Sequence, residues 1–158
     1  MWDIIIKISA VAGIVGLIAS LAAWDQARGA KRAAEKAGNV VTLQKTAYDI
    51  MEIMRICEIS EIISDSEINN KYGNINGRIM SIVGLLEEKS DLVDKNIIDS
   101  VQNNLTAIYQ ELTTPVDSEN AKIPHYAYNR FIPLFNQLIG SLGKLKGKID
   151  GKLLINNK

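Results

Sequence analysis

The pattern of apolar and polar positions separates one continuous apolar stretch from a longer, amphipathic remainder. From Ile4 to Trp24, every residue except Lys7 is apolar or small. At about 1.5 Å per residue, a helix that reaches from Trp2 to Trp24 spans about 33 Å, close to the hydrocarbon thickness of a bilayer. The pattern therefore predicts a single N-terminal transmembrane helix, within an anchor of residues 1–25.

The residues that flank this stretch predict its position and orientation. Trp2 and Trp24 bracket it, and indole rings prefer the headgroup level of a bilayer. Arg28, Lys31 and Arg32 follow it closely, and no basic residue precedes it. The positive-inside rule then places the C-terminal side in the cytoplasm. We expect a single-pass protein of the bacterial inner membrane, with these five residues at the membrane interface.

Two alternatives stay open for this part of the chain. A cleaved signal peptide needs a basic region before its apolar stretch, and Asp3 stands there instead, although a peptidase could accept the small run at 20–22. The basic residues of segment 26–39 belong either to a membrane-exit linker whose basic face touches anionic lipid, or to a linker surrounded by water.

Small residues recur along the apolar stretch. Ala12, Gly16 and Ser20 stand at every fourth position, on one face of a helix. Such a stripe lets membrane helices approach each other closely and associate. We expect a homo-oligomer that is joined through these residues. The alternative is that small residues are simply common in membrane helices.

Beyond residue 40, apolar residues recur at helical spacing with acids between them. No segment alternates at period two for long enough to predict a strand, so we expect residues 40–158 to form an all-α cytoplasmic bundle. Ser90 is a candidate N-cap, Pro133 is expected to bend the last helix, and the lysine-rich end is expected to fray it. The expected helices cover about 40–66, 78–88, 91–112 and 125–143, with loops at 69–78 and 113–124. The residues of the third helix that are expected to face inward are Leu92, Ile97, Ile98, Val101, Leu105, Ile108 and Leu112.

Composition adds two constraints. The formal net charge is zero, so no overall positive field points to DNA as a partner. A single cysteine, Cys57, cannot form an intramolecular disulfide and suits a reducing cytoplasm. We expect Cys57, Met51 and Met54 to lie on a packed helix face rather than in a redox or metal site.

The sequence offers no motif for catalysis. It contains no P-loop, no Gly-x-Ser-x-Gly, no Cys-x-x-Cys and no His-Glu-x-x-His. One histidine and one cysteine are too few to argue for a zinc site. The acidic residues between 87 and 99 are typical of a solvated helix face. We therefore expect no enzyme activity, no metal and no cofactor.

One polar and aromatic cluster differs from ordinary bundle surface. His125, Tyr126, Asn129 and Arg130 follow a loop directly, where a helix N-terminus offers free N–H groups, tyrosine offers a stacking face and arginine grips phosphate. This is a candidate nucleotide site, with Arg78 as a second candidate. The alternative is that the tyrosines pack against the loop and Arg130 pairs with an acid.

The layout of the chain resembles that of a known family. An N-terminal span, a basic exit, a compact cytoplasmic domain without catalytic residues and a polar, aromatic loop resemble the small membrane-anchored effectors of type III CRISPR antiviral defence. These effectors sense a cyclic oligoadenylate messenger through a cytosolic domain. The resemblance implies a homo-oligomer, a tetramer being the expected form, that binds cyclic tetra-adenylate and then perturbs the membrane of the infected cell.

Two other functions are compatible with the same layout. A holin-like or toxin-like membrane protein would act without a ligand, and the small-residue stripe suits it equally well. A membrane-tethered scaffold would recruit a protein partner through its acidic or basic faces.

Overall fold

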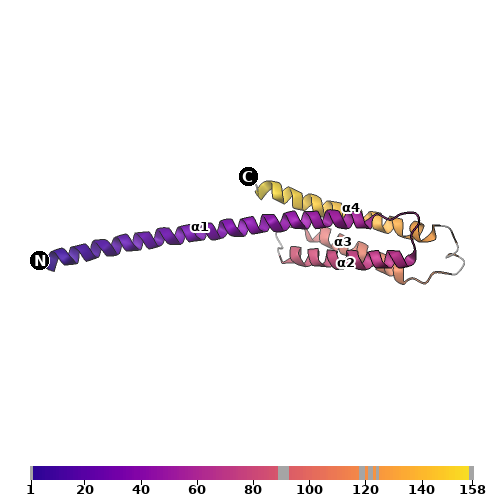
Figure 1. Cartoon of the computed structure of the whole chain (residues 1–158), viewed down its shortest axis with the longest axis horizontal. Helices are drawn as coiled ribbons and strands as arrows, with labels where there is room; N and C mark the ends of the chain where they lie inside the picture. The colour runs from indigo at the N-terminus through magenta and orange to yellow at the C-terminus, as the bar shows by residue number, and fades with distance from the viewer. Residues whose placement is uncertain (1, 89–92, 118–119, 121–122, 124, 157–158) are drawn as a thin grey trace. The chain divides into compact units, whose positions relative to one another are not determined.

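The structure is a computed structural model that describes the backbone of residues 2–88, 93–117, 120, 123 and 125–156. Within these ranges, side chains are described from residue 20 onward, except at 21, 22 and 156. The described part of the chain is all-α, as the sequence predicts, and contains no strand (Figure 1). Its helices are α1 (Trp2–Cys57), α2 (Asp65–Glu87), α3 (Lys95–Thr113) and α4 (Tyr126–Asn156).

The chain divides into two compact units, Met1–Val41 and Thr42–Lys158, which we call unit 1 and unit 2. The described residues of unit 1 all belong to α1, and the helix continues through segment 26–39. The many Ala, Lys, Arg and Glu residues of this segment favour helix strongly enough to offset Gly29 and Gly38.

Most of the predicted anchor lies outside the residues whose side chains are described. This applies to Trp2, Ala12 and Gly16, whereas Ser20 is described and exposed. Within the described residues, no helix combines the length and the apolar character that a membrane span requires. At the end of the apolar stretch, the guanidinium carbon of Arg28 lies 3.7 Å from the centroid of the Trp24 ring, a cation–π contact.

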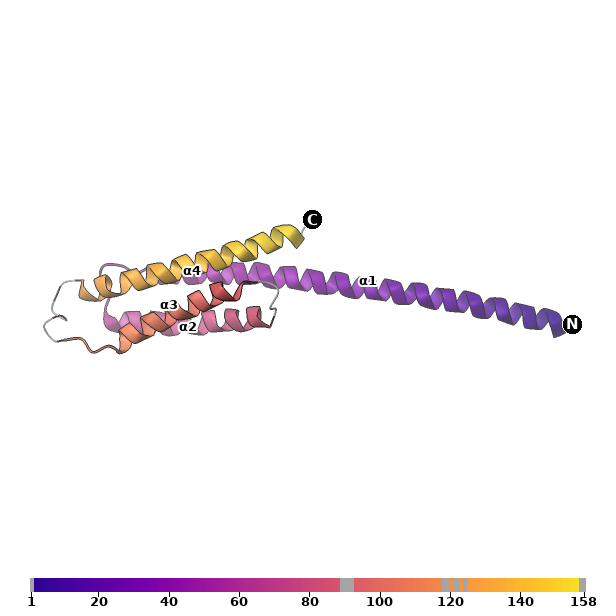
Figure 2. The same cartoon turned by 180° about the vertical axis from the view of Figure 1, so that it is seen from behind.

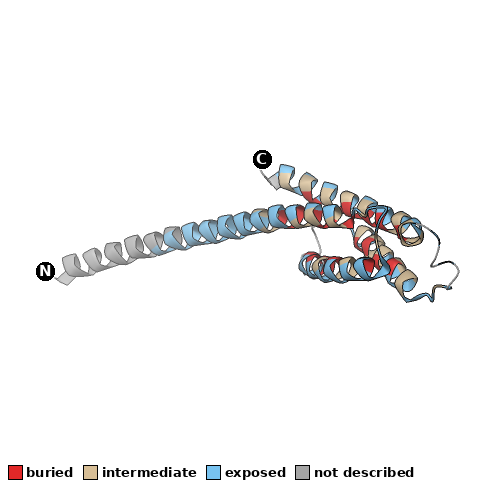
Figure 3. Cartoon of the chain, turned by 45° about the vertical axis from the view of Figure 1, so that its right-hand side comes forward, coloured by how far each residue is buried: buried red, intermediate tan, exposed pale blue. Residues whose placement is uncertain are grey.

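Unit 2 is a bundle in which the last part of α1 lies beside α2, α3 and α4 (Figures 1 and 2). The buried faces of these four segments turn toward one another (Figure 3). Fully buried side chains from every helix form one core, among them Leu43, Ile50, Ile75, Ile79, Val101, Ile108, Phe131, Phe135 and Leu142. Of the predicted inward residues, Ile98, Val101, Leu105 and Ile108 are buried on α3, and Ile97 and Leu112 are partly buried against the core. Leu92 lies outside the described residues.

Helices α3 and α4 pack along an extensive interface. Small polar side chains at their interface allow this packing and hydrogen-bond to one another. The hydroxyl oxygens of Ser100 and Ser141 are 3.1 Å apart, and Asn104 donates to Ser141 Oγ at 2.6 Å. The polar groups that this interface buries are therefore satisfied, as a buried interface requires.

Segment 69–78 is helical, and the predicted loop there is wrong. It forms the middle of α2, where Ile68, Ile75 and Ile79 are buried along one face and Tyr72 packs between them. Burial of this apolar face outweighs the weak helix propensity of the asparagines and glycines around it. Helix α2 begins earlier than predicted because Ser64 and Glu67 form a capping box.

Other element boundaries also differ from the prediction. Helix α1 ends at Cys57 and a loop follows, whereas a single helix was expected to reach residue 66. Helix α3 begins at Lys95 with Asp94 as its N-cap, and the candidate cap Ser90 lies outside the described residues. Helix α4 reaches Asn156 without fraying at its lysines, because Leu145 and Ile149 bury that segment against the core.

The predicted packed face of α1 is confirmed at two of its three positions. Cys57 is buried, and Met54 packs against the core. Met51 is exposed, so its predicted place on the packed face is wrong. Burial raises the pKa of the Cys57 thiol from its ordinary 9.0 to about 12. The thiol therefore stays protonated and unreactive at neutral pH.

Candidate functional site

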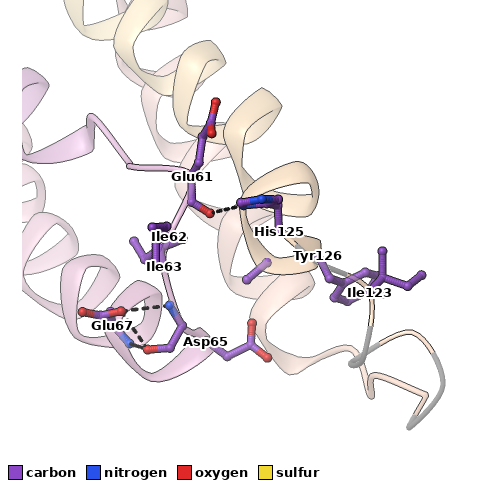
Figure 4. A pocket seen from close by; sticks show the side chains of 10 residues that line it. Glu61, Ile62, Ile63, Asp65, Glu67, Ile123, His125 and Tyr126 are labelled. Atoms are coloured by element: carbon purple, nitrogen blue, oxygen red, sulfur yellow. Dashed lines mark hydrogen bonds between the residues drawn. The ribbon is translucent and has the colours of Figure 1, made fainter.

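An open hollow of about 490 Å³ lies at the end of the bundle where the loop between α1 and α2 meets the start of α4 (Figure 4). Its apolar lining comes from Ile62, Ile63, Ile123 and Ala127, and its acidic lining from Glu61, Asp65 and Glu67. Ile62 is 87% exposed, the largest value among the exposed large hydrophobic side chains of the described residues. The hollow thus combines an apolar surface open to water with a rim of negative charge.

His125 joins the two segments that form the hollow. Its Nδ1 lies 2.9 Å from the carbonyl oxygen of Glu61 (Figure 4). A carbonyl oxygen only accepts, so Nδ1 carries the proton and donates it in this geometry. The backbone of His125 has a φ of 58°, in the left-handed region that residues other than glycine seldom occupy. This turn directs the chain into α4, where the carbonyl of His125 accepts from the N–H of Asn129 at 2.9 Å.

The acidic rim is held in place by the cap of α2. The backbone N–H and the hydroxyl of Ser64 both lie 2.9 Å from Glu67 Oε2, and the Glu67 N–H donates to Ser64 Oγ at 3.3 Å. The backbone hydrogen bond from Ser64 is the main cause that lowers the pKa of Glu67, with the side-chain hydrogen bond as the next cause. Glu67 is therefore a carboxylate at neutral pH.

Arg130 lies at the start of α4, and the fold itself uses its guanidinium. Nε donates to Glu111 Oε1, and Nη2 donates to the carbonyl oxygen of Glu111 and, at 3.0 Å, to that of Thr114. The side chain is only 9% exposed, and its guanidinium carbon lies 5.2 Å from the centroid of the Phe131 ring. Arg130 therefore ties α4 to the end of α3, as the pairing alternative of the sequence analysis describes.

Arg78 lies apart from the other candidate residues, on α2. Its Nη2 is 2.8 Å from Glu52 Oε2 on α1, and this hydrogen bond is the main cause that lowers the pKa of Glu52. A second open hollow, of about 420 Å³, lies beside it and is lined by Lys45, Asp49 and Ser81 as well. This hollow carries two cations, so its charge differs from that of the hollow at Glu61.

The structure brings together only part of the predicted ligand set. His125 and Tyr126 line the acidic hollow, and the Arg130 guanidinium carbon lies 6.0 Å from the Tyr126 ring centroid. Asn129 is exposed in the first turn of α4 and does not line the acidic hollow. Arg78 belongs to the other hollow.

The residues that shape the acidic hollow were not among the sequence candidates. The sequence predicts one helix over about 40–66, and Glu61, Ile62 and Asp65 fall within its length. Acids and isoleucines at such positions are typical of any amphipathic helix. The signal that could have found them is Ser64-Asp65-Ser66-Glu67, a Ser-x-x-Glu capping pattern that predicts the start of a new helix and a loop before it.

The chemistry of the acidic hollow favours a cation. Three carboxylates at its rim repel a phosphate, and its only imidazole is held by a backbone carbonyl. No group of three or more His, Cys, Asp or Glu residues in the described part of the chain is arranged to hold a metal ion. The carboxylates and the apolar side chains of this hollow therefore suit a ligand that is positively charged and partly apolar.

Comparisons with protein-family models, with curated proteins and with solved structures found no match to this chain.

Proposed function

We propose that this chain is a membrane-tethered recognition protein. Its N-terminal segment anchors it in the inner membrane, and unit 2 binds a partner protein in the cytoplasm through the acidic hollow. The partner presents a lysine or arginine beside an apolar side chain, so that the charge meets the carboxylates and the apolar group covers Ile62. The anchors of several copies associate through Ala12, Gly16 and Ser20.

The acidic hollow is the observation that carries this proposal. Ile62 is 87% exposed, so it contributes little to the stability of the fold. Removing its side chain from water in a complex would favour binding. Around it, Glu61, Asp65 and Glu67 supply a charge pattern that selects positive partners and speeds their association. The carboxylate of Glu67 is held in the capping box, which reduces the ordering cost of binding.

The anchor is supported by the sequence of residues 4–24. The apolar stretch has the length of a membrane span, and basic residues follow on one side only. The contact between Arg28 and Trp24 keeps a cation beside an indole ring at the end of this stretch, a pair suited to the headgroup region.

The tether is tested by fractionation of cells that express the full chain. The double variant I14R/L17R places two charges in the middle of the apolar stretch, at a cost of about 3 kcal/mol each. We expect the wild-type chain to resist extraction by alkaline carbonate and the variant to be released. The matched control, Q26R, adds a charge outside the stretch and should stay in the membrane fraction. Release of the wild-type chain would contradict the tether.

Recognition is tested by site-specific photocrosslinking of the full chain in cells. A photoreactive residue at Ile62 should capture a protein, and the captured peptide should contain Lys or Arg next to an apolar residue. The same residue at Met80, which is exposed on α2, is the positional control. The double variant E61K/D65K should abolish capture at Ile62 without unfolding the bundle. Capture of peptides without basic residues, or capture that survives the charge reversal, would overturn the proposal.

A second candidate function is the cyclic oligoadenylate effector that the layout resembles. The hollow beside Arg78 favours it, because its lining includes two cations, Lys45 and Arg78, against one carboxylate, Asp49, although a phosphate would compete with Glu52 for Arg78. In a tetramer, copies of this hollow could together bind the four phosphates of cyclic tetra-adenylate. Messenger binding would then change the packing of the anchors and perturb the membrane, provided that the messenger binds one packing state more tightly than the other.

Two measurements test this candidate. The purified full chain should bind cyclic tetra-adenylate and not linear adenylate, and R78A should weaken binding. Absence of binding at micromolar messenger would end this candidate. The membrane potential of expressing cells separates the remaining functions: loss only with messenger indicates the effector, loss without it a holin-like or toxin-like protein, and no loss the recognition protein.

A further inference from the structure

A further hollow adjoins the acidic hollow along the loop between α1 and α2. It has a volume of about 440 Å³ and is lined by the end of α1, by this loop and by α2. The two hollows share Ile62, Ile63 and Glu67 among their lining residues. Asn70 and Asn74 also line the further hollow, which we call the amide hollow. A ligand that covers Ile62 therefore meets both hollows.

Poor helix formers stand on the exposed side of α2 beside this hollow. Glu67, Asn70 and Asn74 follow one another at intervals of three and four residues, so they lie on one face of α2. Asn70, Gly73 and Asn74 are exposed, and an added Cβ at Gly73 meets no atom within 4 Å. Packing thus does not require these residues in the middle of a helix. Exposed residues that weaken a helix without a packing reason are expected where a protein binds.

The charged groups of the amide hollow are used by the fold. Lys71 Nζ donates to the carbonyl oxygen of Glu58 at 2.7 Å and to that of Ile56 at 3.1 Å, which ties α2 to the end of α1. The carboxylate of Glu67 is held in the capping box. The amide hollow therefore offers a ligand carboxamides and apolar side chains more readily than charge. A carboxamide donates and accepts, so it can pair with both the N–H and the C=O of a peptide main chain.

Side chains also fix the loop that both hollows share. Besides the hydrogen bond from Lys71 at its start, the carbonyl oxygen of Glu61 accepts from His125 (Figure 4). The hydroxyl of Ser60 donates to the carbonyl oxygen of Ile62 at 3.1 Å. A loop that is already ordered loses less conformational entropy when a ligand binds. Ile62 is thus held ready for a partner.

We propose that the partner of the acidic hollow binds as an extended segment of polypeptide that crosses Ile62 and continues into the amide hollow. The proposal rests on the recognition function and names the form of its ligand. The carboxylates of the acidic hollow select a lysine or arginine of the segment by charge complementarity. The adjacent apolar side chain covers Ile62, and Asn70 and Asn74 hydrogen-bond to the main chain beyond it.

The hollows also set the form and the length of the segment. In a helix the main-chain N–H and C=O groups bond to one another, so an extended segment is the form that can pair with both carboxamides. Glu67 and Asn74 are about 10 Å apart along the axis of α2. An extended chain covers this distance in about three residues. The recognised segment is therefore at least about four residues long, with its basic residue at the acidic end.

The experiment places a photoreactive residue at Ile62 or at Asn74 of the full chain in cells. Mass spectrometry then identifies the crosslinked residues of the captured protein. We expect both positions to capture the same protein, at residues within about five positions of each other in its sequence. The positional control is a photoreactive residue at Asn69, which is exposed on α2 and lines neither of the two hollows.

Matched asparagine substitutions decide whether the carboxamides bind the segment. N70A/N74A should lower the yield of capture at Ile62 about 10-fold, because two hydrogen bonds to the segment are lost. N69A removes an asparagine of the same helix and should leave the yield unchanged. Alanine favours helix more than asparagine does, so a loss of capture in N70A/N74A does not reflect a loss of α2. Circular dichroism confirms that each variant is folded.

The outcomes separate this proposal from the function on which it rests. Capture at Ile62 without capture of the same protein at Asn74 would leave the recognition function standing and overturn the extended segment. Crosslinks to distant parts of the partner's sequence would assign the site to a folded surface and overturn it as well, as would an unchanged yield in N70A/N74A. No capture at Ile62 would overturn the recognition function and this proposal with it.

Discussion

The two ends of α4 use their charged residues in opposite ways. At the start of the helix, Arg130 is almost buried and bonds to Glu111 and to a carbonyl oxygen of Thr114. In the last turns, Lys144 and Lys148 are exposed, while Leu145 and Ile149 pack in the core. The guanidinium at the first end takes part in holding the helices together, whereas Lys144 and Lys148 at the last end are exposed to water.

This difference shows where ligand binding can be expected. A cation that already has several hydrogen bonds must lose them before it can bind a phosphate, and the cost offsets the gain. A lysine on an exposed face has lost little of its hydration and can exchange water for a ligand. Charge in the sequence alone therefore does not locate a site, and the burial and partners of each charged group decide.

The largest expected effect is that of R130A. The substitution leaves the carboxylate of Glu111 and two carbonyl oxygens without their donor, so we expect the free energy of unfolding to fall by about 2–3 kcal/mol. Glu111 is partly exposed, and the solvent keeps the loss below that of a fully buried pair. Urea denaturation followed by circular dichroism measures the change.

The control for this prediction is R78A. Arg78 also pairs with a glutamate, but both partners are more than a third exposed, so a loss of about 0.2–1 kcal/mol is expected. Equal losses for the two variants would contradict the expectation that the buried guanidinium of Arg130 stabilises the fold more than the partly exposed guanidinium of Arg78.

Next in size is the cap at the acidic hollow. S64A removes the hydroxyl of the capping box and should lower the free energy of unfolding by about 1 kcal/mol. The lowered pKa of Glu67 adds a pH dependence with a defined sign. Its stabilising contribution is present above the ordinary value of 4.5 and is lost as the pH falls toward the lower folded value.

The control for the cap is E67Q, which keeps a hydrogen-bond acceptor but cannot titrate. The difference in stability between the wild type and E67Q, measured by urea denaturation over this pH range, should shrink in acid. A difference that stays constant as the pH falls would show that the charge of Glu67 does not stabilise the cap.

A smaller effect of opposite sign is expected at the other end of α4. Gly151 lies inside a helix, and an added Cβ meets no atom within 4 Å. G151A should therefore raise the free energy of unfolding by about 0.5–1 kcal/mol, because alanine loses less backbone freedom on folding. Thermal unfolding measures the gain. A loss of stability instead would mean that this face is packed within the protein and is not open.

The smallest effect is expected for K146A. The pair with Asp150 spans one helical turn at the surface, so its removal should cost at most about 0.5 kcal/mol. A loss of stability as large as that of R130A would contradict the view that the charges of this end contribute little to the fold.

Much of the helical architecture follows from local pattern. The spacing of apolar residues identified α3, the inward face with Ile98 and Val101, and the burial of Cys57. Such faces can be predicted because the helical period repeats over several turns, and each repeat adds evidence. Boundaries depend on single residues, so the end of α1 at Cys57 and the start of α2 after Ser64 were missed.

The candidate site shows the opposite balance. His125 and Arg130 are close in sequence and both lie near the start of α4, but only His125 lines the acidic hollow. The sequence could not indicate that Arg130 donates to Glu111 at the end of α3. Nor could it indicate that His125 hydrogen-bonds to the carbonyl oxygen of Glu61 in the loop after α1. These contacts join residues far apart in sequence, and only the packing of the helices brings them together.

By itself, the sequence determined that the chain is helical, that a long apolar segment precedes an amphipathic domain, and which faces of several helices are buried. These properties depend on the spacing of apolar residues, which is local. The tertiary structure decided which charged groups form hydrogen bonds and ion pairs within the fold and which lie exposed at the surface. The physical reason is that the free energy of a charge depends on its burial and its partners, and both are set by segments that meet only when the bundle forms.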